Sequence, residues 1–450
     1  MNNNRIAMFI LAGLLTVPFF FYNKWQDVDY WGHLFFGRKT LETRRIQRTD
    51  IYSYTALGRE WTNHEWLGEV AFYSVYNRAA EKGLIFFKLL IGFVTGIFLF
   101  ATLMLYSKNY KIVFSIYLLA MSLVYAGASF RPHLFTYLLL SACLFLVHLY
   151  IKNKNELFLW CLIPVMILWA NLHGGFVAGI ILIAVLLFGE RFKRYYYFMI
   201  VLILSSLITP YGVKLWKALF VALTNPLTSQ YITEWMPFNP DDFSWLGYVY
   251  LFYIVLCAVS ALSCLRYGRY ACFIAVLSGI IFALKSARHI PLLAIIASPF
   301  IMIYFEKLKN KHIASALIFS AYPQFFLIVF LSLSNPSARI EAGNKFPSGA
   351  VNFIKENKIS GNIFNEFNWG EYVIWHLNES CKVAIDGRYD TVYPVEYLGN
   401  YFEKGEIPPN TDYLLVKPVR KIDEKLWKVS YKDDNAVIYS RKLDETKKNR

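Results

Sequence analysis

Two aspartates beside a long apolar run are the first candidates for chemistry in this sequence. Asp27 and Asp29 stand in "KWQDVDYWGHLFFGR", residues 24–38, directly after a stretch that is typical of a membrane span. A carboxylate just outside a span can act as a general base toward a hydroxyl, and two carboxylates this close can share a proton or hold a divalent cation. The alternative is an interfacial turn with solvated acids. The amphipathic "DYWGHLFFG" that follows favours a segment lying along the membrane surface.

A histidine and two glutamates form a second candidate group in "EWTNHEWLGEV", residues 60–70. His64 and Glu65 begin an H-E-x-x-H pattern, but Gly68 stands where the second histidine is needed, so one helix face cannot supply two zinc-binding histidines. Glu65 and Glu69 are four residues apart and could face one cavity. A loop helix whose acids are solvated is an equally good interpretation.

Basic and imidazole side chains mark the ends of several apolar runs. These candidates for substrate or phosphate binding are Arg131, His133, His173, Arg288 and His289. Arginines near a lipid interface can bind a phosphate group through paired N–H donors. Arg131 and Arg288 are better placed for this than the cluster at 44–48, which we expect to contact lipid headgroups.

The polar tail has one distinctive string, "VAIDGRYDTVY", residues 383–393. Its β-like run ends at Asp386, and Arg388 and Asp390 follow directly. Acids at a strand end can line a site. They can also cap the next turn or pair with Arg388, and both interpretations stay open.

The composition of the 450-residue chain places these residues in a membrane protein. Hydrophobic residues make up 56% of the sequence and charged residues only 17%, which is typical of a polytopic membrane protein. The net charge of +15 is concentrated in short connections, whereas the tail from residue 334 balances 18 basic against 17 acidic residues. We therefore expect membrane lipids as partners and no nucleic acid. Six cysteines without a C-x-x-C pair indicate neither a disulfide framework nor a zinc site.

Apolar runs with the approximate length of a span occur about eleven times, at 6–22, 84–106, 112–130, 133–150, 157–170, 175–188, 196–209, 246–265, 270–284, 289–305 and 313–333. Every second connection is basic, so the positive-inside rule predicts a cytoplasmic N-terminus and an external tail. The sequence thus predicts an α-helical polytopic domain over 1–333 with an extracytoplasmic loop at 23–83. All candidate residues named above then lie on the extracytoplasmic side or at span ends there.

The tail, residues 334–450, is predicted to be an extracytoplasmic α/β domain. A helical pattern starts at Pro347, and four short β-like runs follow at 361–367, 382–386, 412–417 and 435–441.

An aspartate motif after the first span, many further spans and a C-terminal α/β domain together resemble the GT-C class of membrane glycosyltransferases. The strings "DVDYWGHLFFGR", "TDIYSYTALGREWTNHEWLGEV", "WANLHGGF", "TPYG", "FNWGEYVIW" and "VAIDGRYD" resemble more closely a largely uncharacterised bacterial family of GT-C-like membrane proteins. The resemblance covers nearly the whole chain.

This resemblance implies a transferase of cell-envelope glycan assembly in the bacterial plasma membrane. Its donor would be a sugar on a polyprenyl phosphate or diphosphate, and its acceptor an extracytoplasmic glycan, lipid or protein. A first-loop acid is the usual base in GT-C enzymes, which implies Asp29 with Asp27 as its partner. Such a scheme requires no cofactor, although Asp27 and Asp29 could hold a divalent cation. Arg131, Arg288 or His289 would stabilise the departing phosphate.

Two other classes of function are compatible with the topology. A transporter of lipid-linked glycans would be expected to carry ionisable residues in the middle of its spans and often an internal repeat, and neither is evident in the sequence. A non-catalytic envelope scaffold would tolerate replacement of Asp27 and Asp29.

Overall fold

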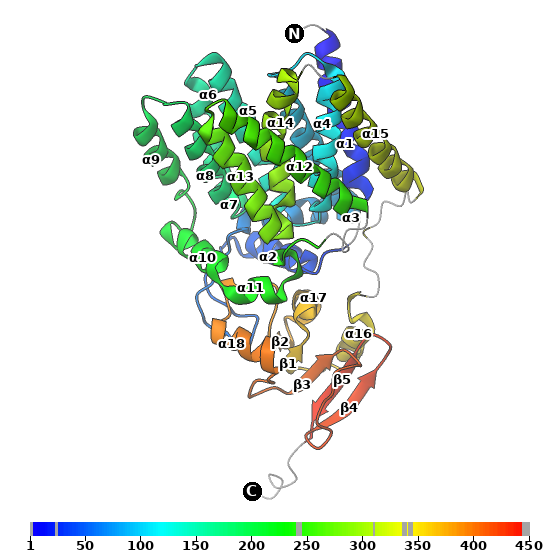
Figure 1. Ribbon diagram of the computed structural model, residues 1–450. Helices are drawn as coiled ribbons and strands as arrows, with labels where there is room; N and C mark the ends of the chain where they lie inside the picture. Colours follow the sequence, from blue (N-terminus) through cyan, green and yellow to red (C-terminus); the bar gives the residue numbers. More distant parts are fainter. Residues whose placement is uncertain are drawn as a thin grey trace, which may run out of the picture. The chain divides into compact units, whose positions relative to one another are not determined.

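The computed structural model describes residues 3–22, 26–239, 245–308, 311–334, 340 and 345–442 (Figure 1). Contacts divide the chain into two compact units. The first unit contains Met1–Lys24, Arg78–Val213 and Thr228–Arg339, and the second contains Trp25–Asn77, Lys214–Leu227 and Ile340–Arg450.

The described part of the first unit is helical. Its elements are α1 (Asn3–Tyr22), the later part of α3 (Trp66–Met104), α4 (Tyr110–Ala126), α5 (His133–Asn153), α6 (Leu157–Trp160), α7 (Leu162–Leu172), α8 (Phe176–Gly189), α9 (Tyr195–Ser205), most of α11 (Pro226–Tyr231), η1 (Thr233–Trp235), α12 (Trp245–Arg266), α13 (Tyr270–Lys285), η3 (Ala287–His289), α14 (Ile290–Lys307) and α15 (Lys311–Ser334).

Helices coincide with all of the predicted apolar runs. Among the described residues, four stretches are long and apolar enough to cross a membrane: Trp66–Met104, His133–Asn153, Gly247–Arg266 and Ala287–Lys307. Shorter apolar helices match the other runs. The chain is thus a mostly helical membrane protein, and the number of eleven spans stays a prediction.

Helix α3 belongs to both units because its backbone breaks near one third of its length. Ala79 and Ala80 leave helical geometry, and Ala80 has φ 47°. The first part of α3 lies in the second unit, and the part from Arg78 onward lies in the first. The predicted span begins at residue 84, so the first turns of α3 precede it.

A five-stranded sheet forms the centre of the second unit, in the order β2-β1-β3-β5-β4. Its strands are β1 (Gly361–Asn365), β2 (Cys381–Val383), β3 (Tyr413–Val416), β4 (Trp427–Lys432) and β5 (Val437–Arg441). β1 runs parallel to β2 and β3, whereas β5 is antiparallel to β3 and β4. The parallel strands β1 and β2 need a crossover connection, which contains helix α17 (Gly370–Leu377).

Further helices complete this unit: α2 (Tyr30–Thr43), α10 (Val213–Thr224) from its second residue, α16 (Ser348–Glu356), η5 (Phe367–Trp369), η6 (Tyr389–Thr391), α18 (Val395–Gly399) and the π-helical turn η7 (Asn400–Lys404). The small C-terminal sheet and helix α16 occur where the sequence predicts an α/β tail. Strand β4 and helix α17 were missed there.

The first loop joins the tail's sheet directly. Ser53 forms a parallel bridge with Val383 at the edge strand β2. The Val383 N–H donates to the Tyr52 carbonyl at 3.2 Å, and the Tyr54 N–H donates to the Val383 carbonyl at 3.1 Å. Residues far apart in the sequence therefore share one backbone hydrogen-bond network, which fixes the loop against the tail.

Candidate functional site

Asp27 and Asp29 have different tasks at the start of helix α2. The Oδ1 atom of Asp27 accepts the Asp29 N–H at 3.1 Å, which closes a turn. Asp29 is the N-cap residue of α2, and its carbonyl accepts the His33 N–H at 3.0 Å. Its side chain makes no capping hydrogen bond to the helix. The Asp29 carboxylate is therefore not used to begin α2, although an N-cap aspartate usually is.

Glycines bring Asp29 close to a second carboxylate that the sequence analysis did not select. A Cβ atom at Gly387 would collide with both Asp29 Oδ1 and Glu371 Oε1, and one at Gly32 would collide with Glu371 Oε2. Both carboxylates thus approach the same backbone position. Glu371 is 5% exposed and lies in the first turn of α17. The strings around Asp29, Glu371 and Gly387 come from distant parts of the chain and meet at this point.

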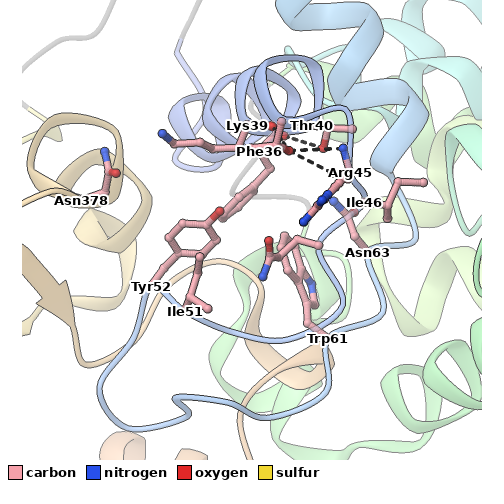
Figure 2. A pocket seen from close by; sticks show the side chains of 12 residues that line it. Phe36, Lys39, Thr40, Arg45, Ile46, Ile51, Tyr52, Trp61, Asn63 and Asn378 are labelled. Carbon is pink, nitrogen blue, oxygen red and sulfur yellow. Dashed lines mark hydrogen bonds between the residues drawn. The ribbon is translucent and has the colours of Figure 1, made fainter.

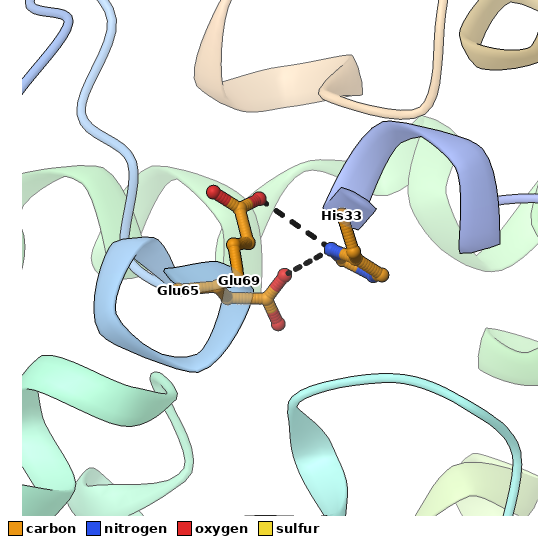
Figure 3. A group of neighbouring side chains, drawn as sticks. All are labelled: His33, Glu65 and Glu69. Carbon is orange, nitrogen blue, oxygen red and sulfur yellow. Dashed lines mark hydrogen bonds and ion pairs between the residues drawn. The ribbon is translucent and has the colours of Figure 1, made fainter. Parts of the chain in front are cut away.

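A histidine and two glutamates form a second cluster one helical turn further along α2 (Figure 3). His33 Nδ1 lies 3.4 Å from Glu69 Oε1 and 3.7 Å from Glu65 Oε2. The three residues each offer one atom, and these atoms lie within 4.8 Å of one another. His64 Nε2 lies 3.7 Å from the other Glu65 oxygen. The arrangement offers one nitrogen and two oxygen ligands, so the residues fit a divalent cation.

Glu69 is the most deeply buried member of this cluster. Burial raises the pKa of Glu69 to about 8, and neither a hydrogen bond from Asn63 nor the charge of Arg388 offsets this. The expectation of solvated acids in this segment is therefore wrong for Glu69, whose side chain is only 4% exposed. The alternative, that Glu65 and Glu69 face one place, agrees with the structure.

Arg388 is the centre of a buried charge network in the same unit. Its Nε and Nη2 atoms donate to the two oxygens of Asp386 at 2.8 and 2.6 Å. Its Nη1 lies 2.6 Å from Asp50 Oδ1. Burial opposes ionisation of Asp386, but Arg388 and a hydrogen bond from Tyr393 outweigh it and lower the pKa of Asp386. Of the two open interpretations of "VAIDGRYD", the structure shows pairing between Asp386 and Arg388.

This network joins the tail to the first loop. The Asp50 carboxylate also accepts the backbone N–H of Tyr52 at 3.1 Å and of Ser53 at 3.2 Å. The Arg388 guanidinium lies 4.9 Å from the centre of the Trp61 ring and 5.2 Å from that of Phe36. Because all three charges are fully or almost fully buried, we assign the network a role in structure.

A pocket of about 280 Å³ opens beside this network in the second unit (Figure 2). It is lined by Phe36, Lys39, Thr40, Thr43, Arg45, Ile46, Gln47, Ile51, Tyr52, Trp61, Asn63 and Asn378. Aromatic rings, amides and cationic side chains together suit a polar ligand with hydroxyl groups. Asn63 connects the pocket to the His33 cluster, because its side-chain nitrogen donates to Glu69 Oε2 at 2.5 Å.

The first unit holds its own charge cluster. Arg131 Nη1 lies 3.0 Å from both oxygens of Glu234, and Arg288 Nη1 lies 3.3 Å from Glu234 Oε1. Arg288 also stacks on Trp235 at 4.1 Å. Partial burial opposes ionisation of Glu234, but the two arginines outweigh it and lower its pKa to about 2. One carboxylate against two guanidinium groups leaves a net positive charge, which suits an anion.

Of the predicted histidines of the first unit, His133 and His289 lie near members of this cluster in the sequence and His173 does not, and their contacts differ. His133 Nε2 lies 2.5 Å from the Gly127 carbonyl, and its ring centre is 6.4 Å from that of His173. His173 Nδ1 accepts the Gly175 N–H at 2.9 Å. His289 packs edge-on against Trp235. These imidazoles thus contact backbone groups and neighbouring rings.

The structure brings the predicted residues together in two sets. Asp27, Asp29, His64 and Glu65 belong to the second unit, and Arg131, His133, His173, Arg288 and His289 belong to the first. Sequence reasoning missed Glu371 as a site residue and gave His33 no role, whereas it paired Glu69 with Glu65. The spacing of four between Asp29 and His33 was the available signal for His33.

The fold defines the class of protein that this chain resembles. Its apolar helices and C-terminal α/β domain share the fold of solved structures of an archaeal oligosaccharyltransferase. No protein-family model and no curated protein matches the sequence.

The matching structures include several of the oligosaccharyltransferase AglB of Archaeoglobus fulgidus. Its apo form has 12% sequence identity and a TM-score of 0.59 over 91% of this chain and 69% of that chain. The complex with an inhibitory peptide and a dolichol-phosphate has 13% identity and a TM-score of 0.59 over 92% and 69%. The complex with Zn and sulfate has 12% identity and a TM-score of 0.57 over 91% and 67%. At this identity the likeness is one of fold.

Proposed function

We propose that this protein is a membrane glycosyltransferase that moves a sugar from a polyprenyl-phosphate-linked donor to an extracytoplasmic acceptor. The observation that carries the proposal is the Asp29 carboxylate, which makes no helix cap and converges with Glu371 at Gly387 within a GT-C-like fold. A neighbour of the same fold was solved with a dolichol-phosphate, and another with a tethered acceptor peptide. Lipid-linked donors and separate acceptors are therefore compatible with this fold.

Asp29 is the proposed general base. It takes the proton of an acceptor hydroxyl while the acceptor oxygen bonds to the anomeric carbon of the donor sugar. The bond between that carbon and the phosphate oxygen breaks, and polyprenyl phosphate or diphosphate leaves with the bonding electrons. Asp27 positions the base, because its carboxylate holds the Asp29 N–H. A base positioned in this way typically contributes about 10²- to 10⁴-fold to the rate.

Arg131 and Arg288 are the proposed phosphate ligands. Glu234 holds both guanidinium groups toward one place, and the cluster keeps one net positive charge for an anion. His133, His173 and His289 complete the proposed set in the first unit. His64 and Glu65 complete the proposed substrate-binding set in the second unit, which also contains the pocket lined by Asn63.

The proposed setting is a bacterial plasma membrane, with a role in assembly of cell-envelope glycans. The N-terminus is cytoplasmic, and loop 23–83 and domain 334–450 are extracytoplasmic, outside the transmembrane domain 1–333. This topology supports the proposal because it puts Asp29 and the tail on the side where the acceptor is found.

Release of polyprenyl phosphate from a lipid-linked sugar donor tests the function. Wild type, Asp29→Asn and Asp27→Asn are purified in detergent and supplied with donor and acceptor. We expect Asp29→Asn to lose about 10²-fold or more, and Asp27→Asn to lose less because it retains the base. If Asp29→Asn releases polyprenyl phosphate as fast as wild type, the assignment of the base is wrong.

A further inference from the structure

His33, Glu65 and Glu69 converge from two helices, and we infer that they hold one divalent cation. His33 lies on α2, whereas Glu65 and Glu69 lie at the start of α3 (Figure 3). Both carboxylates point at the same imidazole nitrogen, Nδ1.

The distances between these atoms are long for hydrogen bonds and agree with those between ligands of one metal ion. An N–H···O hydrogen bond is usually about 2.7 to 3.2 Å long. Here the two distances from Nδ1 are 3.4 and 3.7 Å. Ligand atoms about 2.1 Å from a tetrahedral cation lie about 3.4 Å from one another. Nδ1 is thus spaced from each carboxylate oxygen as two ligands of one cation are, and all three atoms lie within 4.8 Å of one another.

The backbone places the ligands before any cation binds. The Glu69 N–H donates to the Glu65 carbonyl at 2.9 Å, so one helical turn puts both glutamates on the same face. Gly37 allows α2 to approach this turn, because a Cβ atom there would collide with the Glu69 carbonyl. This close approach brings His33, one turn earlier on α2, within reach of both carboxylates.

Asn63 provides the outer support that metal ligands commonly have. Its side-chain nitrogen donates to Glu69 Oε2 at 2.5 Å and leaves Oε1 facing His33. Its side-chain oxygen accepts the Glu65 N–H at 3.1 Å. Such contacts fix the orientation of a ligand, and their loss typically lowers metal affinity about 10- to 100-fold.

The donor atoms define the class of cation. One imidazole and two carboxylates suit Zn²⁺ or Mn²⁺ better than Ca²⁺ or Mg²⁺, which prefer oxygen ligands alone. In the cation-bound state, two ionised carboxylates and a neutral imidazole balance the charge of a divalent ion. Three protein ligands leave coordination positions open. We assign these positions to an anionic oxygen of the substrate, and this last step rests on the proposed function.

Metal binding to the full-length protein in detergent tests the inference without an activity assay. Mn²⁺ is titrated into metal-free wild type, His33→Gln, Glu65→Gln and, as a control, Glu42→Gln. Glu42 is an exposed carboxylate on the same helix α2 that pairs with Arg38 and Lys39. We expect one Mn²⁺ per chain for wild type and Glu42→Gln, and at least about tenfold weaker binding for the two ligand variants.

Pulsed electron paramagnetic resonance then identifies the nitrogen ligand. Wild type loaded with Mn²⁺ should show a ¹⁴N coupling that His33→Gln lacks. Glu65 is partly exposed, so Glu65→Gln decides the outcome if His33→Gln does not fold. The inference is overturned if wild type shows no saturable binding, or if the folded ligand variants bind Mn²⁺ as wild type does.

Failure of this inference can be told apart from failure of the proposed function. If the site binds Mn²⁺ but Asp29→Asn releases polyprenyl phosphate as fast as wild type, the cation site stands and the base is wrong. If the fully metal-depleted protein releases polyprenyl phosphate at the wild-type rate, the proposed function stands and the cation has no part in turnover.

Discussion

At the scale of the residue, Arg388 links the first loop to the tail by ion pairs. Its single positive charge is buried between Asp386 and Asp50. Removing one member of a buried ion network is costly because the remaining charges have no counter-charge and no water.

Replacement of Arg388 should therefore weaken the whole second unit. We expect Arg388→Met to lower the free energy of unfolding by about 3 to 5 kcal/mol, because Asp386 and Asp50 are left buried together. Thermal unfolding followed by tryptophan fluorescence in detergent measures the loss. Arg59→Met, at an exposed position of the same loop, is the matched control. Equal midpoints for the two variants would contradict a structural role for the network.

The ion pairs of Glu234 lead to a prediction about how the stability of the fold depends on pH. Its pKa is about 2 in the folded protein, below the ordinary 4.5, since Arg131 and Arg288 outweigh the effect of partial burial. A lowered carboxyl pKa stabilises the fold fully above pH 4.5, and this contribution is lost as the pH falls toward 2. The side chain is 34% exposed, so solvent weakens the effect.

The unfolding midpoint of wild type should thus fall between pH 5 and pH 3 more steeply than that of Glu234→Gln, which has no such proton to gain. Midpoints measured every half pH unit test this. Parallel curves for the two proteins would show that the arginines do not hold Glu234 ionised in the folded state.

Residue types in the sequence were sufficient to select Asp29, but not its neighbour. Asp29 stands beside an apolar run, where a carboxylate is unusual. Glu371 lies in a polar tail that contains many acids, and only the backbone approach at Gly32 and Gly387 distinguishes it. The sequence contains these glycines, but it does not indicate which carboxylates lie against them in the fold.

At the scale of the element, the turn after β2 has no space for a side chain at Gly387. Gly387 lies between Asp386 and Arg388, and its missing side chain leaves room for Asp29 and Glu371. We expect Gly387→Ala to displace both carboxylates and to lower the release of polyprenyl phosphate about 10²-fold, because small displacements of reacting groups are costly.

Gly399→Ala is the control for this variant. Gly399 ends helix α18, and a Cβ atom there has no heavy atom within 4 Å. It should therefore retain wild-type turnover. Wild-type turnover in Gly387→Ala as well would mean that the approach of Asp29 to Glu371 does not matter for the reaction.

Elements with strong periodicity could be predicted, and elements defined by tertiary contacts could not. Apolar runs and helix α16 follow from local sequence. Strand β4 is an exception, because its sequence WKVSYK alternates apolar and polar residues as strands do, and the sequence analysis still did not select it. The bridge between Ser53 and Val383 joins segments 330 residues apart, and no local pattern indicates it.

At the scale of the whole molecule, the predicted topology has a direct test. Alkaline phosphatase fused after the last residue should be active, because it folds only outside the cytoplasm, whereas a fluorescent protein fused there should remain dark. Fusions in the basic connection at 189–194 should give the opposite pattern. An inactive alkaline phosphatase fusion at the C-terminus would contradict an extracytoplasmic tail.

The bridge between Ser53 and Val383 also has a consequence for biogenesis. Ribosomes add about 5 to 20 residues per second, so strand β2 follows the first loop after roughly 15 to 65 seconds. During that interval the carboxylate of Asp50 has been made but the guanidinium of Arg388 has not. The first loop therefore has no partner strand while most of the membrane helices are still being inserted. A chaperone or the insertion machinery would have its longest opportunity to act on this protein in that interval.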